Sequence, residues 1–212
     1  TGVTVDSSDN IYVTGQTGGG LDGNTNSGAA DIVLVKYNSS GTKLWTQQLG
    51  TSSDEYGWGV TVDSSNNIYV TGTTSGGLDG NTNSGSSDVF LLKYNSSGTK
   101  QWTRQLGTSE KDKGQGVTVD SSNNIYVTGF TEGGLDGNTD FSNGFGDSDV
   151  FLVKYNSSGI KQWTKQLGTS SDSRGVTQGV DSSNNIYVTG ASDGILLVKY
   201  NSSGTKQWTQ SF

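Results

Sequence analysis

The sequence predicts an all-β protein: a β-propeller built of four-stranded antiparallel blades, with four blades in this chain. Three observations predict it. One segment recurs four times, its apolar residues alternate with polar ones as in pleated strands, and short Asn/Ser/Gly turns separate the strands. No stretch combines a helical period with helix caps. We therefore expect each repeat to fold as one four-stranded sheet.

The repeats set the domain organisation. DSSDNIYVTG or DSSNNIYVTG begins at Asp6, Asp63, Asp120 and Asp181, and KYNSSG begins at Lys36, Lys93, Lys154 and Lys199. We predict a single propeller region over residues 1–212, with blades at approximately 1–50, 57–107, 114–168 and 175–212. The four blades either close alone, which is the small limit of this architecture, or form part of a larger ring. Further blades or a second copy of the chain would complete that ring.

The second unit illustrates the four strands. Val60 and Val62 share one face of the first strand, and Ile68 and Val70 share one face of the second. DVFLLKY, at 88–94, is apolar on consecutive positions, which is typical of a strand covered on both faces. KQWTRQLG forms the fourth strand around a Trp. We predict that one Trp per unit packs blade against blade, at Trp45, Trp102, Trp163 and Trp208.

Composition excludes several classes of chemistry. The chain has no Cys and no His, which removes disulfides, zinc–thiolate sites, thiol nucleophiles and the commonest general base. A net charge of −7 argues against a nucleic-acid partner. No apolar run approaches the roughly 20 residues of a spanning helix, so we expect a soluble piece without membrane insertion. The absence of Met indicates a piece of a longer product whose leader, if any, has been removed.

The charges are unevenly distributed along each unit. All acidic residues except five (Asp6, Asp9, Asp63, Asp120 and Asp181) lie between the second and third strands or between one unit and the next. Only Lys111, Lys113 and Arg174 of the 13 basic residues lie there. Because these connections share one face of a propeller, we expect one strongly acidic face. Such a face keeps a secreted ring soluble, or it binds cations or a basic partner.

The repeated LDGNT segments are candidate calcium loops. Alternate oxygen-bearing residues in a curled loop point inward, as calcium requires. The candidate ligands are Asp22, Asn24, Asn26 and Asp31 in the first copy, Asp79, Asn81, Asn83 and Asp88 in the second, and Asp136, Asn138, Asp140 and Asp149 in the third. The alternative is a loop of Asx turns, in which Asn side chains cap their own backbone. The fourth unit replaces the loop with ASDG (Ala191–Gly194), so the fold does not require it.

Two segments of the unit resemble the bacterial SBBP β-propeller repeat, namely KYNSSGTKQWTRQLG (Lys93–Gly107) and GVTVDSSNNIYVTGTT (Gly59–Thr74). The resemblance covers all four units. The second half of the unit is also similar to NHL-type propeller repeats. The chain departs from the SBBP pattern where Asn67, Asn124 and Asn185 stand in place of Gly, and Asn tolerates the left-handed conformation that such a turn needs. The resemblance implies a surface or secreted protein and implies no reaction.

These observations predict an extracellular or cell-surface module that is not an enzyme. Its expected role is structural, adhesive, or binding of a protein or glycan at the acidic face, with no required cofactor. One alternative is a calcium-dependent carbohydrate binder, for which calcium would be the cofactor. Another is a propeller glycosidase or lyase, whose two carboxylates would be Asp54 and Glu55, or Glu110 and Asp112. No catalytic residue is assigned.

Overall fold

The computed structural model describes residues 1–141, 147–168, 174–191 and 194–212, which form four antiparallel four-stranded sheets. The first sheet holds β1 (Gly2–Val5), β2 (Ile11–Thr17), β3 (Asp31–Tyr37) and β4 (Lys43–Leu49). The second holds β5 (Glu55–Val62), β6 (Ile68–Thr74), β7 (Asp88–Tyr94) and β8 (Lys100–Leu106). The third holds β9 (Asp112–Val119), β10 (Ile125–Thr131), β11 (Asp149–Tyr155) and β12 (Lys161–Leu167). The fourth holds β13 (Arg174–Val180), β14 (Ile186–Ala191), β15 (Ile195–Tyr200) and β16 (Lys206–Ser211).

Two single-turn 3₁₀ segments, η1 (Leu78–Gly80) and η2 (Leu135–Gly137), are the helical elements within the described ranges. Strands are hydrogen-bonded to their sequence neighbours, so each sheet is one up-and-down blade. The predicted all-β fold of four-stranded blades is therefore confirmed.

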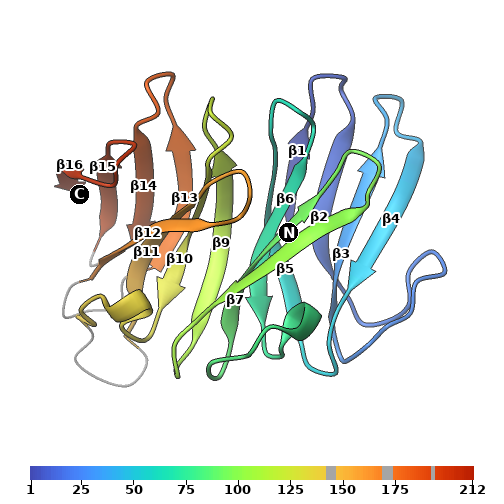
Figure 1. Cartoon of the computed structure of the whole chain (residues 1–212), viewed down its shortest axis with the longest axis horizontal. Coiled ribbons are helices and arrows are strands. Elements are labelled where there is room, and N and C mark those ends of the chain that lie inside the picture. The colour runs from blue at the N-terminus through green and yellow to red at the C-terminus, as the bar shows by residue number, and fades with distance from the viewer. Residues whose placement is uncertain (142–146, 169–173, 192–193) are drawn as a thin grey trace.

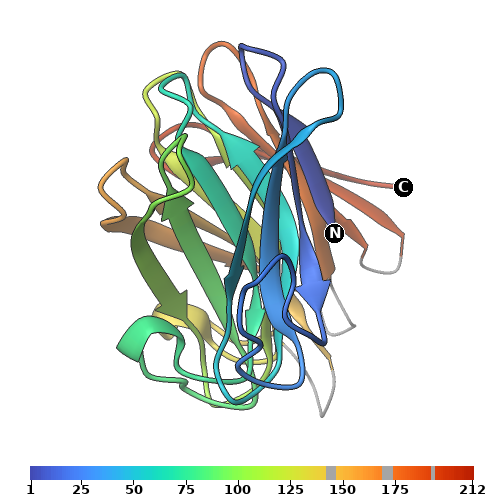
Figure 2. The ribbon, with the colours of Figure 1, turned by 90° about the vertical axis from the view of Figure 1, so that its right-hand side faces the viewer.

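The four sheets stand side by side in chain order, as Figure 1 shows from blue at one side to red at the other. Their first strands are neighbours, because β1 contacts β5, β5 contacts β9, and β9 contacts β13. The Asn/Ser/Gly hairpins lie at one end of the strands, while η1, η2 and the connections from the first sheet to the second and from the second to the third lie at the other (Figures 1 and 2). We call this second end the loop face.

The hydrophobic core consists of layers between adjacent sheets. In the first layer Tyr12, Ile32 and Leu34 of the first sheet pack with residues of the second, such as Ile68 and Phe90. Two further layers join the second sheet to the third and the third to the fourth. Each layer buries alternate strand residues, and this is how a chain with only 29% hydrophobic residues builds a core.

The repeated Trp joins each blade to the next. A Cβ added at Gly98, in the β7–β8 hairpin, would lie 3.1 Å from the Trp45 ring of the preceding blade. Gly159 stands in the same relation to Trp102, and Gly204 to Trp163. The prediction that this Trp packs blade against blade is therefore confirmed at all three junctions.

The two end sheets expose the faces that the middle sheets bury. Val3 on β1 is 68% exposed, whereas its equivalent Val60 on β5 is 8% exposed. At the other end Trp208 is 38% exposed, and no hairpin among the described residues covers its ring as Gly98, Gly159 and Gly204 cover the others. Among the described residues no core layer joins the first sheet to the fourth, so the four blades form an open arc.

The hairpin that joins the first two strands of each blade is fixed by its Asp. In the second blade, Asp63 Oδ1 accepts hydrogen bonds from the backbone N–H groups of Ser65 and Asn67, both at 2.9 Å. The left-handed residue is Asn66, with a φ of 59°, and Asp9, Asn123 and Asn184 take that place in the other blades. The sequence prediction placed it one residue later, at Asn67, and was wrong. The Asn67 side chain instead donates to Asp63 Oδ2 at 2.9 Å.

Candidate ligand-binding site

The LDGNT segments fold back against the outer strand of their own blade. Leu78 and Leu135 are fully buried and belong to the layers between blades, whereas Leu21, in the first described sheet, is 37% exposed. The backbone N–H of Leu78 donates to Gln105 Oε1 at 3.1 Å, and that of Leu135 donates to Gln166 Oε1 at 2.9 Å. The leucine of the motif is therefore a core residue where a preceding blade exists.

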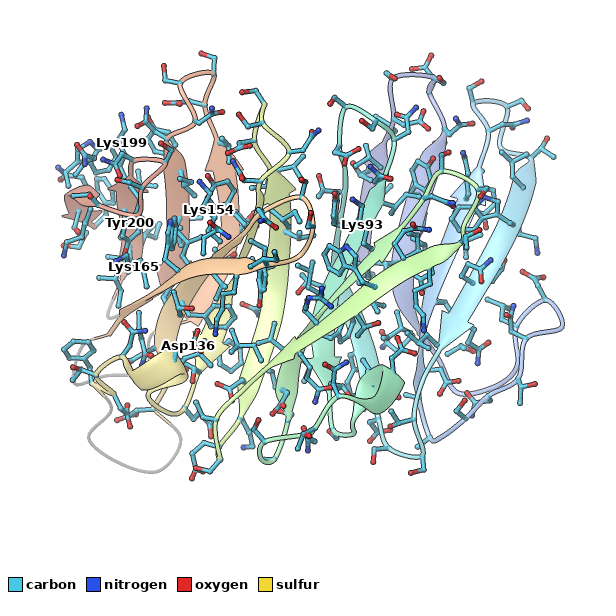
Figure 3. All side chains as sticks on the ribbon, in the orientation of Figure 1. Lys93, Asp136, Lys154, Lys165, Lys199 and Tyr200 are labelled. Carbon is cyan, nitrogen blue, oxygen red and sulfur yellow. The ribbon has the colours of Figure 1, made fainter. Side chains whose placement is uncertain are left out.

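The Asp of each LDGNT segment is left-handed and paired with a lysine. Asp22, Asp79 and Asp136 have φ values of 53°, 50° and 54°. Their carboxylates form ion pairs with Lys43, Lys100 and Lys161, and they also accept hydrogen bonds from Thr46, Thr103 and Thr164. Figure 3 labels Asp136, which lies within η2. Hydrogen bonds from Lys43 and Thr46 lower the pKa of Asp22. These three carboxylates therefore lie against the outer strands.

The other candidate ligands gather around a glutamine at the base of the loop. Gln48 Nε2 donates to Asp31 Oδ2 at 2.9 Å and to Asn26 Oδ1 at 3.3 Å, so Asn26 and Asp31 are brought together. Gln105 joins Asn83 and Asp88 in the same way, and Gln166 donates to Asp149. The side chains of Asn24, Asn81 and Asn138 donate to the carbonyl of the Leu three residues before them. Burial raises the pKa of the Asp149 carboxyl, and the charge of nearby Asp140 adds to the rise.

The structure thus divides the predicted calcium ligands into two groups. The first Asp of each copy pairs with lysine, whereas the last Asp faces a glutamine. In the part of the chain that the structure describes, no group of three or more acidic side chains converges as a metal site would need. The hydrogen bonds are those of the Asx-turn alternative. Calcium binding at these loops stays a prediction.

Buried carboxyl groups from adjacent blades meet at the junctions. Asp31 and Glu55 are both fully buried, and a Cβ added at Gly50 would lie 3.0 Å from Glu55 Oε2 and nearer still to Asp31 Oδ1. Asp88 and Asp112 occupy the same places at the next junction, where each has one oxygen without a hydrogen-bond partner among the described residues. The structure therefore pairs Glu55 and Asp112 with the preceding blade. The glycosidase alternative had paired them with Asp54 and Glu110.

Burial raises the pKa of the Asp112 carboxyl, and the charge of Asp88 adds to the rise, while hydrogen bonds from Thr131 and Thr108 offset part of it. A raised folded-state pKa contributes stability below the unfolded value of 3.8, and this contribution is lost as the pH rises through the folded value. We expect Asp112→Asn to raise the free energy of unfolding by about 1 kcal/mol at pH 7, because it removes one of two adjacent buried charges.

Urea unfolding of the wild type and of Asp112→Asn at pH 7 and pH 4 measures this effect. The gain should shrink at pH 4, because the raised pKa makes the Asp112 carboxyl of the wild type more protonated there than at pH 7. Glu110→Gln is the control, because Glu110 is an exposed neighbour and its replacement should change stability by less than about 0.5 kcal/mol. An Asp112→Asn variant that is less stable than the wild type at pH 7 would contradict the prediction.

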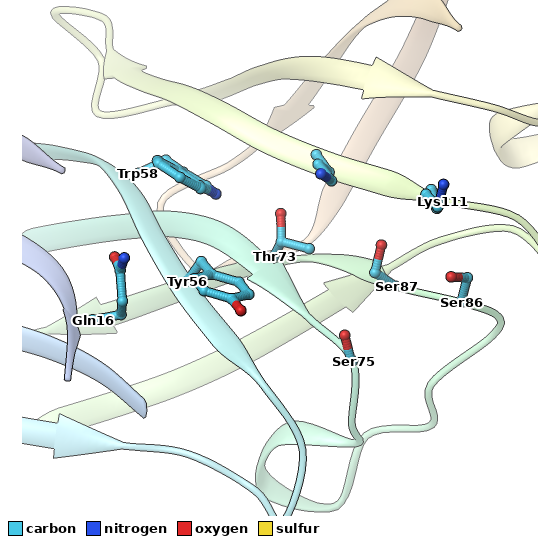
Figure 4. Close-up of a pocket in the computed structure, with 9 residues that line it drawn as sticks. Gln16, Tyr56, Trp58, Thr73, Ser75, Ser86, Ser87 and Lys111 are labelled. Atoms are coloured by element: carbon cyan, nitrogen blue, oxygen red, sulfur yellow. The ribbon is translucent and has the colours of Figure 1, made fainter. Parts of the chain in front are cut away.

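A pocket of about 400 Å³ opens near the loop face between the second and third blades (Figure 4). It is lined by Gln16, Tyr56, Trp58, Thr73, Ser75, Ser86, Ser87, Lys111 and Lys113. The Tyr56 and Trp58 rings are stacked, with centroids 6.2 Å apart and planes inclined by 24°. The pocket therefore combines an aromatic wall, hydroxyl groups and two cations, within the size range of small-ligand sites.

A β-bulge turns Trp58 into this pocket. On β5, Gly57 pairs with Gly72 and Gly59 pairs with Thr71, so Trp58 has no partner across the ladder. Such an extra residue re-aims its side chain. The sequence prediction missed this site, because it considered the four repeated Trp residues and passed over the fifth. The signal that could have found the site is a departure from the repeat, since Tyr56 and Trp58 of the second unit correspond to Lys113 and Gln115 in the third.

The comparison with protein families agrees with this architecture. A model of the SBBP β-propeller repeat matches residues 1–22, 44–79, 101–136 and 162–196. The chain belongs to the SBBP β-propeller repeat family. The predicted resemblance is thereby confirmed, and it extends over all four blades of this SBBP chain.

Two curated relatives are each 28% identical to the SBBP chain. One is "Regulatory protein FlaEY" of Caulobacter vibrioides, over 201 residues, with 85% of this chain and 20% of the relative covered. The other is "Uncharacterized WD repeat-containing protein L264" of Acanthamoeba polyphaga mimivirus, over 199 residues, with 76% and 14% covered. The SBBP chain thus spans a fifth or less of the curated relatives that it matches.

Two solved structures are similar to the chain at low identity, and the first of them shares its fold. A protein of unknown function from Bacteroides caccae is 12% identical with a TM-score of 0.58, and the match covers 99% of the SBBP chain and 60% of that protein. A gluconolactonase from Xanthomonas campestris is 12% identical with a TM-score of 0.48, over 89% of this chain and 53% of that one. Across the described ranges of the SBBP chain, no helix has the length and apolar character that crossing a bilayer needs.

Proposed function

We propose that this SBBP chain is a non-catalytic binding module of an extracellular or cell-surface protein, and that its pocket holds a glycan or protein ligand. The observation that supports this is the pocket itself, which departs from the repeat at Tyr56 and Trp58. Blade packing does not explain an exposed Trp on an inner strand. An aromatic residue in a concave site with unpaired polar groups is typical of ligand recognition.

The location of the buried acidic groups supports a non-catalytic role for the pocket. The buried carboxyls Glu55 and Asp112 lie at the blade junctions, and neither lines the pocket. General acid–base chemistry on a glycoside needs two carboxyl groups that flank the bound substrate. We therefore keep the glycosidase or lyase as the alternative, to be tested by analysing glycans for cleavage products after incubation with the chain.

Glycan and peptide arrays probed with the wild-type chain and with Trp58→Ala test the proposal. We expect ligands that bind the wild type and lose at least tenfold in signal with Trp58→Ala, because the aromatic wall of the pocket is gone. Trp208→Ala is the matched control, since Trp208 is as exposed as Trp58, at 38%, and lies on the fourth blade. Ligands that bind both Trp variants equally, or an array without ligands, would overturn the proposal.

Calcium dependence is read from the same arrays. Probing them with chelator and with calcium on the order of 10 mM, above the range of weak extracellular sites, separates the two binding hypotheses. A signal that requires calcium and is lost with Asp31→Asn favours the calcium-dependent binder. A signal that is unchanged by chelator favours a module that binds through the pocket alone.

A further inference from the structure

The pocket has the chemistry of a site for a pyranose sugar. Trp58 is 38% exposed, and the bulge turns its indole ring away from the ladder. Tyr56, which lies opposite Thr73 on β6, stacks against it. The two rings offer a rigid, nearly flat apolar surface. Such a surface suits the C–H face of a sugar ring, which loses little conformational entropy on binding.

Two hydroxyl groups in the wall are buried and lack partners. Thr73 and Ser87 are 4% and 6% exposed, and neither Thr73 Oγ1 nor Ser87 Oγ has a hydrogen-bond partner among the described residues. Figure 4 shows both side chains beside Tyr56 and Lys111. A buried hydroxyl without a partner costs free energy, and a ligand that supplies the missing hydrogen bond recovers it. Sugar hydroxyls both donate and accept, so they match these groups.

Two lysines give the pocket a positive edge on an acidic protein. Lys111 and Lys113 flank the start of β9 and line the pocket, although the connections around them are mainly acidic. Lys111 lies 3.8 Å from Glu132, and Lys113 stands over the Phe130 ring at 5.7 Å. Within the described ranges Lys113 has no carboxylate at ion-pair distance. A ligand carboxylate would give Lys113 the ion-pair partner that the described residues do not supply.

From this combination we propose that the pocket binds an acidic saccharide: a pyranose that carries a carboxylate, as in a hexuronic acid unit of a polysaccharide. The sugar ring stacks on Trp58, its hydroxyls bond to Thr73 and Ser87, and its carboxylate pairs with Lys113. This inference rests on the proposed binding function and adds the class of ligand. Because the ion pair is open to solvent, we expect a dissociation constant on the order of 0.1–1 mM.

The test compares two oligosaccharides of equal length that differ in the carboxylate. Calorimetry and tryptophan fluorescence follow titration of the full chain with tetragalacturonate and with the matching neutral galactose tetramer. We expect the acidic tetramer to bind at least fivefold more tightly, and this preference to shrink when salt rises from about 0.05 M to about 0.5 M. Equal affinity for the two tetramers would overturn the acidic-saccharide inference and leave the binding function standing.

Three variants locate the binding. Trp58→Ala should weaken both tetramers at least tenfold, whereas Lys113→Gln should remove the preference for the acidic one and leave the neutral one unchanged. Trp208→Ala, at a Trp of equal exposure, should change neither affinity. If the acidic tetramer binds Trp58→Ala as tightly as the wild type, the site is elsewhere and the inference fails. If neither tetramer binds while another array ligand depends on Trp58, the inference fails and the proposed function survives.

Discussion

Replacing Gly72 by alanine is expected to destabilise the protein by about 3 kcal/mol, because the added methyl group has no room to relax. A Cβ at Gly72 would lie far inside van der Waals contact with the backbone carbonyl oxygen of Tyr56 and 2.7 Å from Phe90 Cζ. The carbonyl belongs to the bulged part of β5 and cannot rotate away as a flexible side chain would. In a chain of this length the melting temperature should fall by on the order of 10 °C.

The repeat supplies the matched control for this experiment. Gly15 occupies the same position in the first blade, where β1 begins only at Gly2. Among the described residues, a Cβ at Gly15 would meet only the Thr1 methyl group, at 3.3 Å. Gly15→Ala should therefore change the free energy of unfolding by less than about 1 kcal/mol, as measured by urea unfolding. Equal losses in the two variants would show that the bulge is not the cause.

The blade architecture could be predicted from the sequence because its determinants are local and repeated. Alternation such as Val60 and Val62 marks a pleated strand, and four copies of it mark four blades. Trp102 could be assigned to packing for the same reason, since each unit carries its equivalent. Each of these signals lies within one unit and is strengthened by its copies.

Three features of the structure could not be predicted from the sequence, each for a physical reason. Leu78 is a core residue inside a polar segment, and a single apolar residue has no period from which burial can be inferred. The meeting of Asp88 with Asp112 depends on how two blades face each other, which spacing along the chain does not express. Trp58 differs from its equivalents in the other units, so a search for what the units share passes over it. Residues that break a repeat are therefore the better candidates for function.

The open ends of the arc repeat the chemistry of the closed junctions. Lys93 stands over the Tyr69 ring at 5.3 Å and donates to the Ser157 carbonyl of the next blade at 3.1 Å. Lys199 stands over Tyr187 in the same way on the fourth blade, where the described residues include no further blade to accept its hydrogen bond. Figure 3 labels Lys93, Lys154 and Lys199 at corresponding places in three successive blades. A further blade of this repeat would meet the same groups at that end.

The second large effect is expected at the first hairpin of the second blade, where Asp63→Ala should destabilise the protein by about 3 kcal/mol. Asp63 accepts the backbone N–H groups of Ser65 and Asn67, the Asn67 side chain, and the Tyr69 hydroxyl at 3.0 Å. Tyr69 is fully buried, so its hydroxyl would be left without an acceptor. Adding Tyr69→Phe to Asp63→Ala should therefore recover about 1 kcal/mol, which urea unfolding of the double-mutant cycle measures.

The loss at Asp63 should also depend on which blade carries it. Tyr69 packs with Trp102 and carries Lys93 on its ring, so the hairpin supports the junction with the third blade. Tyr187 in the fourth blade donates to Asp181 at 3.1 Å but is only partly buried. Asp181→Ala should therefore destabilise the protein distinctly less than Asp63→Ala. Equal losses would mean that the Asp acts within its own hairpin alone. Unequal losses in the expected order mean that its contribution reaches the junction between blades through the tyrosine.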